Sequence, residues 1–135
     1  MNIELTEKEF RRLLDLVYIG NWVLNSTRGD DRFEDYDIVE SRIFSHCKDV
    51  GMKALASEFL GISYPSEAFA SGGIHDAIAD YENTVFFDIL AEELAMRDMD
   101  YAPINQENLD ELNNRMDEYI DEFEANGMEN IHVDI

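Results

Sequence analysis

Basic side chains are scarce in this sequence. Ten Lys and Arg residues, of which only three are Lys, stand beside 31 Asp and Glu residues in a chain of 135 residues, giving a formal net charge of −21. A surface of this charge repels nucleic acid, anionic membranes and phosphorylated substrates, and it attracts cations and basic proteins. We therefore expect neither a nucleic-acid partner nor a membrane partner, and we consider a basic protein as the candidate partner.

The deficit of basic residues is concentrated in the second part of the chain. Residues 1–53 contain 11 acidic and 8 basic side chains, a balance of −3. Residues 54–135 contain 20 acidic side chains and only Arg97 and Arg115 as bases, a balance of −18. Any recognition of a basic partner is therefore expected in the second part.

Proline, glycine and cysteine are also few. Two Pro and seven Gly leave long stretches uninterrupted, which favours long helices. The only cysteine, Cys47, cannot form an internal disulfide, as is typical of a reducing compartment. No apolar run approaches the roughly 18 residues that a membrane span needs, and the first residues lack the pattern of a signal peptide. These absences predict a cytoplasmic protein.

Hydrophobic residues are nevertheless abundant enough for a core. They make up 45% of the chain and include eight Phe and six Tyr, unlike the composition of disordered acidic tails. The length fits one domain, and no internal repeat or low-complexity tract divides it. We predict a single domain that covers residues 1–135.

Helical periodicity governs the first third of the chain. Thr6 and Glu9 have the spacing of a capping box, and apolar residues then recur at helical intervals to about Asn25. A second apolar stripe runs over residues 36–50, and Gly51 follows it as a helix stop. We expect two amphipathic helices here.

The middle of the chain is less regular. Its apolar residues predict a short amphipathic helix over 52–60. Gly, Pro and Ser then interrupt the pattern, so residues 61–73 are expected to form a loop that contains one helical turn near 67–70.

The remaining chain returns to helical periodicity. Residues 74–100 are expected to form two helices, with Asn83 or Thr84 as the cap between them. The last helix is predicted to begin after Asn105 as its N-cap and to end at Gly127 in a Schellman motif.

Both ends of the chain alternate apolar and polar residues as strands do. The alternating positions are Ile3 and Leu5 at the start and Ile131, Val133 and Ile135 at the end. The termini can pair as a tiny two-stranded sheet, and a docked extended tail is the alternative. The sequence as a whole predicts an all-α, single-domain bundle of about five helices with no other sheet.

Two histidine positions define one candidate enzymatic site. His46, the pair His75-Asp76 and Asp80 one turn later are similar to the ligand types of HD-type phosphohydrolases, whose divalent metal activates water. The pattern is short, and the ordinary interpretation of Asp76 is an acidic residue that complements a helix N-terminus. A metal-dependent HD-like phosphohydrolase is therefore kept as an alternative, while the leading expectation is a protein without catalytic residues, metal or cofactor.

Carboxylates on the last predicted helix define the candidate partner surface: Asp117, Glu118, Asp121 and Glu122. The ordinary interpretation is a solvated helix face, or adaptation to salt. The functional interpretations are a docking surface for a basic protein and, as an alternative, a mimic of nucleic-acid phosphates that acts as an inhibitor. The leading hypothesis is a non-enzymatic helical protein that contacts a basic partner. The oligomeric state stays open, a homodimer included.

Arg97 is surrounded in sequence by acidic residues. An arginine in this setting can bind an anion or can fix helix packing through ion pairs. Because no glycine-rich loop or second base accompanies it, we predict the structural role.

Three segments carry a resemblance to a known group of proteins: residues 18–22 (Tyr-Ile-Gly-Asn-Trp), 94–98 (Leu-Ala-Met-Arg-Asp) and 119–127 (Tyr-Ile-Asp-Glu-Phe-Glu-Ala-Asn-Gly). They are similar to segments of an uncharacterised bacterial family of small acidic all-α proteins. That family has no assigned activity, so the resemblance implies no substrate and no catalytic residue. It implies a cytosolic bacterial protein.

Overall fold

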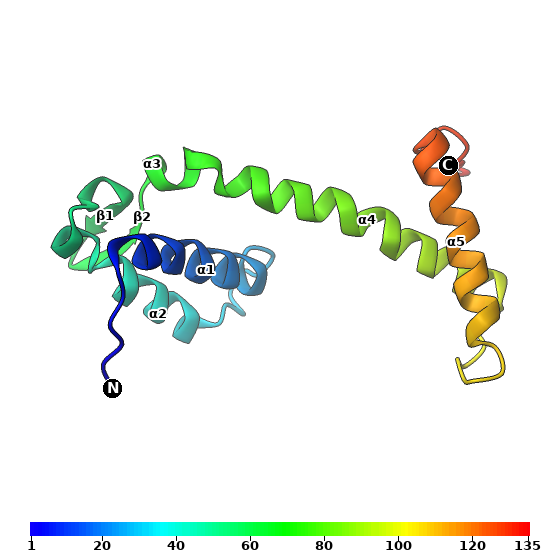
Figure 1. Ribbon diagram of the computed structural model, residues 1–135, viewed down its shortest axis with the longest axis horizontal. Coiled ribbons are helices and arrows are strands. Elements are labelled where there is room, and N and C mark those ends of the chain that lie inside the picture. Colours follow the sequence, from blue (N-terminus) through cyan, green and yellow to red (C-terminus); the bar gives the residue numbers. More distant parts are fainter. The chain divides into compact units, whose positions relative to one another are not determined.

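The computed structural model describes residues 1–135, of which 64% lie in helices, and this confirms the predicted predominance of helix (Figure 1). Four helices are long: α1 (Glu7–Asn25), α2 (Glu34–Phe44), α4 (His75–Asp98) and α5 (Leu109–Asn126). The short elements are 3-10 turns at Cys47–Val50 and Lys53–Leu55, strands β1 (Ala56–Phe59) and β2 (Ile62–Pro65), α3 (Glu67–Phe69), and a π-helical turn at Ala70–Ile74. None of the helices combines the length and apolar composition needed to cross a membrane.

The chain divides into two compact units, residues 1–78 and residues 79–135. Helix α4 runs from one into the other without interruption, so the predicted cap at Asn83 or Thr84 is wrong. The Thr84 hydroxyl instead donates to the Asp80 carbonyl at 2.8 Å, as hydroxyl residues inside helices do. Whether the whole chain is a single domain stays a prediction.

The first unit begins with the predicted capping box. The Thr6 hydroxyl accepts a hydrogen bond from the Glu9 amide at 3.2 Å, and the Glu9 carboxylate accepts one from the Thr6 amide at 2.8 Å. Helix α1 then continues to Asn25, where the sequence predicted its end. Helix α2 lies alongside α1 (Figure 1). The chain turns after α2, and Gly51 stops the following 3-10 turn with a positive φ of 74°.

The core of the first unit is formed by six buried apolar residues from α1, α2 and the segments that follow: Phe10, Leu14, Phe44, Cys47, Phe69 and Ile74. The rings of Phe44 and Phe69 meet edge to face, with centroids 5.1 Å apart, a favourable aromatic geometry. Burial raises the pKa of the Cys47 thiol, so this side chain stays neutral and acts as a small apolar residue.

A β-hairpin occupies part of the segment for which the sequence predicted a helix over 52–60 and a loop over 61–73. Strand β1 pairs antiparallel with β2, with Ala56 opposite Pro65 and Phe59 opposite Ile62. Leu60 and Gly61 form the two-residue turn, with φ of 50° and 77°. Two positive φ values in succession give the turn the twist that hairpins prefer. The prediction was wrong because helical spacing of a few apolar residues does not exclude a strand when the turn that ends it is favourable.

Helix α3 confirms the helical turn expected near residues 67–70. It begins at the Ser66 N-cap, whose hydroxyl accepts from the Phe69 amide at 3.2 Å and donates to the Ala54 carbonyl at 2.6 Å. The termini, in contrast, form no strand, so of the two alternatives for the ends the pairing as a sheet is wrong. The sheet lies in the hairpin instead, because a two-residue connection brings strands together at far lower entropic cost than the full chain does.

The second unit consists of the rest of α4 and of α5, with an ordered turn between them. Asn105 does not cap the helix directly: its side chain accepts from the Glu107 amide at 2.8 Å, and α5 starts one turn later. The predicted glycine stop is confirmed in part, since Gly127 has a positive φ of 59° and donates its amide to the Phe123 carbonyl at 2.9 Å.

Candidate functional site

The structure does not bring together the four residues of the HD-like hypothesis: His46, His75, Asp76 and Asp80. The Nδ1 atom of His46 lies 3.3 Å from an oxygen of Asp49, whereas the Nε2 atom of His75 lies 2.6 Å from the Tyr18 hydroxyl. Asp76 and Asp80 are exposed on α4. No group of three or more His, Cys, Asp or Glu side chains is arranged to hold a metal ion. The geometry therefore offers no metal centre on which a phosphohydrolase mechanism could be built.

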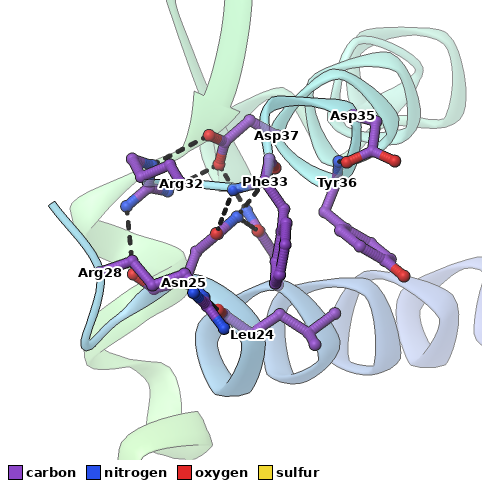
Figure 2. Close-up of polar contacts among 9 residues, drawn as sticks. Leu24, Asn25, Arg28, Arg32, Phe33, Asp35, Tyr36 and Asp37 are labelled. Carbon is purple, nitrogen blue, oxygen red and sulfur yellow. Dashed lines mark hydrogen bonds and ion pairs between the residues drawn. The ribbon is translucent and has the colours of Figure 1, made fainter. Parts of the chain in front are cut away.

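A polar network joins the end of α1 to the start of α2 (Figure 2). The buried Asn25 amide donates to the Asn21 side chain at 2.7 Å and to the Phe33 carbonyl at 3.1 Å, and its oxygen accepts from the Phe33 amide at 2.8 Å. Arg32 adds two hydrogen bonds to the Asp37 carboxylate, at 2.7 and 3.0 Å. These ion-paired hydrogen bonds lower the pKa of Asp37. The network holds the connection over residues 26–33 against both helices.

Beside this network lies a polar pocket of about 300 Å³, lined by Tyr18, Asn21, Trp22, Asn25, Ser26, Arg32 and Glu40. Burial raises the pKa of Glu40, and burial followed by the Glu40 charge raises that of Tyr18. No buried side-chain nitrogen or oxygen in the protein lacks a hydrogen-bond partner. Because its buried polar groups are satisfied from within, we assign this pocket a structural role.

A larger depression, about 540 Å³, lies between α2 and the hairpin. Its lining mixes serines, both signs of charge and two isoleucines: Glu34, Asp37, Ile38, Ser41, Arg42, Ser45, Gly61, Ile62 and Ser63. It contains neither histidine nor cysteine, and it offers no arrangement of groups that favours one class of ligand.

The structure separates the four predicted partner-binding acids of α5 into two stripes. Asp117 and Asp121, four residues apart, share one stripe with Glu124, and Glu118 and Glu122 share the next. Asp117, Glu118 and Asp121 are exposed. Glu122 is already engaged, since it accepts from the side chains of Asn126 at 3.0 Å and Asn130 at 2.6 Å. Three of the four carboxylates are therefore available to a partner.

Both basic residues of the second unit are paired within it. Arg97 binds Asp98 at 2.8 and 3.0 Å and reaches the Tyr119 hydroxyl of α5 at 3.3 Å, which confirms its structural interpretation. Arg115 binds Glu111 at 2.8 and 3.0 Å. The Tyr119 hydroxyl also donates to Asp98. This bond, followed by those from Arg97, lowers the pKa of Asp98, and the bond to Asp98 raises the pKa of Tyr119.

Aromatic rings bridge α4 and α5 in a continuous row. The centroids of Phe86 and Phe87 are 5.1 Å apart, those of Phe87 and Phe123 are 5.3 Å apart, and those of Phe123 and Tyr119 are 6.1 Å apart. Each spacing is that of a favourable aromatic pair. Phe123 is buried, whereas Phe86 at the outer end of the row is 46% exposed.

Next to this row lies a pocket of about 230 Å³, which we call the α4–α5 pocket. It is lined by Asn83, Thr84, Phe87 and Asp88 of α4 and by Ile120, Phe123 and Glu124 of α5. Its apolar lining comes from Phe87, Ile120 and Phe123, and its two carboxylates, Asp88 and Glu124, are exposed. The pocket thus combines an apolar surface with negative charge at solvent.

Sequence reasoning did not single out Asp88 or Phe87 as binding residues. Their helical spacing with Asn83 and Thr84 places all four on one side of α4, and that signal was present in the sequence. The sequence pattern did not show which residues of α5 lie opposite them, because the contact with Ile120 and Phe123 depends on how α5 packs against α4.

Comparisons with known proteins identify no relative of this chain. The resemblance to an uncharacterised bacterial acidic family stays a prediction, and so does a bacterial origin. No family model, no curated protein and no solved structure was found to match this chain.

Proposed function

We propose that this protein is a non-enzymatic acidic helical protein that acts through contact with a basic protein, and that residues 79–135 make the contact. One observation carries the proposal. This unit contains 17 acidic and 2 basic side chains, a balance of −15, and both bases are bound to carboxylates within it. A field of one sign attracts an oppositely charged protein and accelerates its association.

The arrangement of the acids supports a macromolecular partner over a single cation. No cluster of side chains has the geometry of a metal site, and the carboxylates of α5 lie along the helix. Such a spread matches several basic side chains on another protein surface. We place this activity in the cytoplasm, in keeping with the single unpaired and buried Cys47.

The proposal is tested by titrating the protein, labelled for NMR, with a synthetic Lys-rich peptide at low and at high salt. We expect binding at low salt, release as salt rises, and chemical-shift changes confined to residues 79–135. A peptide that does not bind, or that shifts mainly residues 1–78, would contradict the proposal. The nucleic-acid mimic is the special case of a DNA-binding partner, and competition between this protein and duplex DNA for such a partner tests it.

A further inference from the structure

We propose that the α4–α5 pocket receives a Lys or Arg side chain from a basic amphipathic helix of the partner. The inference rests on the proposed function and names the site and the kind of segment that it recognises. At about 230 Å³ the pocket is smaller than the roughly 300–1,000 Å³ of pockets that hold whole small ligands. It is of a size for one side chain.

The lining of the pocket matches both parts of such a side chain. Long basic residues lay their aliphatic stems on apolar surface and keep their charge at solvent. Here Phe87, Ile120 and Phe123 line the pocket with apolar atoms on which such a stem can lie. Asp88 and Glu124, both exposed, offer acceptors for the charged end.

The surroundings of the pocket match the rest of an amphipathic helix. Phe86 touches Phe87 and is exposed, and Ile89, three residues further along the same helix, is exposed as well. Within this unit only Ala91, Ala95, Leu112 and Phe123 are buried apolar residues, so much of its apolar side-chain surface faces solvent. Apolar surface next to acidic residues suits a helix with one apolar and one basic face.

Net charge favours a basic segment of another protein over a second copy of this chain as the occupant of the α4–α5 pocket. A second copy of this chain would bring another unit of −15 against the first, and like charges in one interface are strongly unfavourable. A helix rich in Lys and Arg removes that repulsion. The occupant is therefore a basic segment of another protein.

The experiment compares two synthetic peptides on the full chain by calorimetry. One is built of Leu and Lys at helical spacing, and the other has the same Lys residues with every Leu replaced by Gln. The pocket variant is Asp88→Asn with Glu124→Gln. The matched control, Glu93→Gln with Glu107→Gln, removes the same charge from exposed positions outside both the pocket and the four candidate partner-binding acids of α5. Circular dichroism confirms that both variants fold.

We expect the pocket variant to weaken binding of the Leu/Lys peptide by about tenfold, since a hydrogen bond to a charged group has that effect. The control should weaken binding by less than about threefold, as separated surface charges do. Equal losses in the two variants would overturn the inference, and so would equal affinity for the two peptides. Both of those results leave the proposed function standing, whereas the absence of binding by either peptide would overturn both.

Discussion

The two units of the chain bury their aromatic side chains and distribute their charges differently. In residues 1–78, Phe44 is fully buried against Phe69, and 14 acidic residues are balanced in part by 8 basic ones. In residues 79–135, Phe123 is 7% exposed, its row of rings ends in solvent at Phe86, and the charge balance is −15. The first unit thus contains a closed aromatic pair and a small net charge, whereas the second combines a partly open aromatic row with a strongly acidic surface.

The difference concerns long-range repulsion more than individual ion pairs. The first unit has several pairs, Arg28–Asp31 and Arg32–Asp37 among them, and exposed pairs of this kind contribute little stability each. Their main effect is that they keep the summed field weak. The second unit lacks that compensation, so its compactness depends on the aromatic row and on the conditions of the solvent.

The largest expected effect is in the closed core. Phe44→Ala should lower the free energy of unfolding by about 3–5 kcal/mol, because the cavity left beside Phe69 has few ways to collapse. Urea denaturation measures the loss. Phe59→Ala is the control, since this ring is 67% exposed and its removal should change stability by less than about 0.5 kcal/mol. A loss below about 1 kcal/mol in Phe44→Ala would refute the closed core.

Phe123→Ala should cost somewhat less, about 3 kcal/mol, because one end of the aromatic row already faces solvent. Its effect should also be local: hydrogen exchange of the α5 amides should accelerate, while the amides of α1 stay protected. Phe86→Ala serves as the control from the exposed end of the row. Equal loss of protection in α1 and α5 would show that the two units unfold together.

Salt should stabilise residues 79–135 more than residues 1–78, an effect smaller than those of the two core substitutions. The Debye length, over which charges act on one another, falls from about 30 Å at 0.01 M to about 3 Å at 1 M ionic strength. Salt therefore weakens the repulsion between carboxylates. We expect the melting temperature to rise with sodium chloride, and the exchange rates of α5 amides to fall more than those of α1 amides. Sodium chloride that stabilised both helices equally, or neither, would contradict the assignment of repulsion to residues 79–135.

A smaller gain is expected in the hairpin of the first unit. Leu60 adopts a positive φ of 50° in the turn and is 84% exposed, so its side chain gains little from packing while the backbone is strained. Asn tolerates this conformation and is favoured before Gly in such turns. Leu60→Asn should therefore stabilise the protein by about 0.5–1 kcal/mol in urea denaturation, whereas Leu60→Val should destabilise it.

The smallest effect concerns Glu40, whose pKa is raised by burial beside the α1–α2 network. Folding favours its protonated form, so its charge opposes folding at neutral pH, and this cost disappears as the pH falls below the ordinary range of glutamate. Glu40→Gln should raise the melting temperature slightly at pH 7 and leave it unchanged at low pH. The exposed Glu34 provides the control, because Glu34→Gln should give no gain at either pH.

Features that depend on neighbours in sequence were predictable here. The capping box of Thr6 and Glu9, the extent of α1 and the positive φ of Gly127 follow from hydrogen-bonding groups and backbone sterics within a few residues. The hairpin at 56–65 was not predicted, since its short apolar pattern suited a helix as well as a strand. Helix α4 was divided wrongly at Thr84 because a hydroxyl residue fits both a cap and a helix interior.

The candidate site, too, was predictable from the sequence only in part. The sequence by itself determined the helical class and the excess of acid in the second part of the chain. Only the tertiary structure decided that Phe87 and Asp88 of α4 line one pocket with Ile120, Phe123 and Glu124, and that His46 and His75 take separate partners. Composition and periodicity describe single elements, whereas a pocket requires side chains more than thirty residues apart to meet, and that depends on how the helices pack.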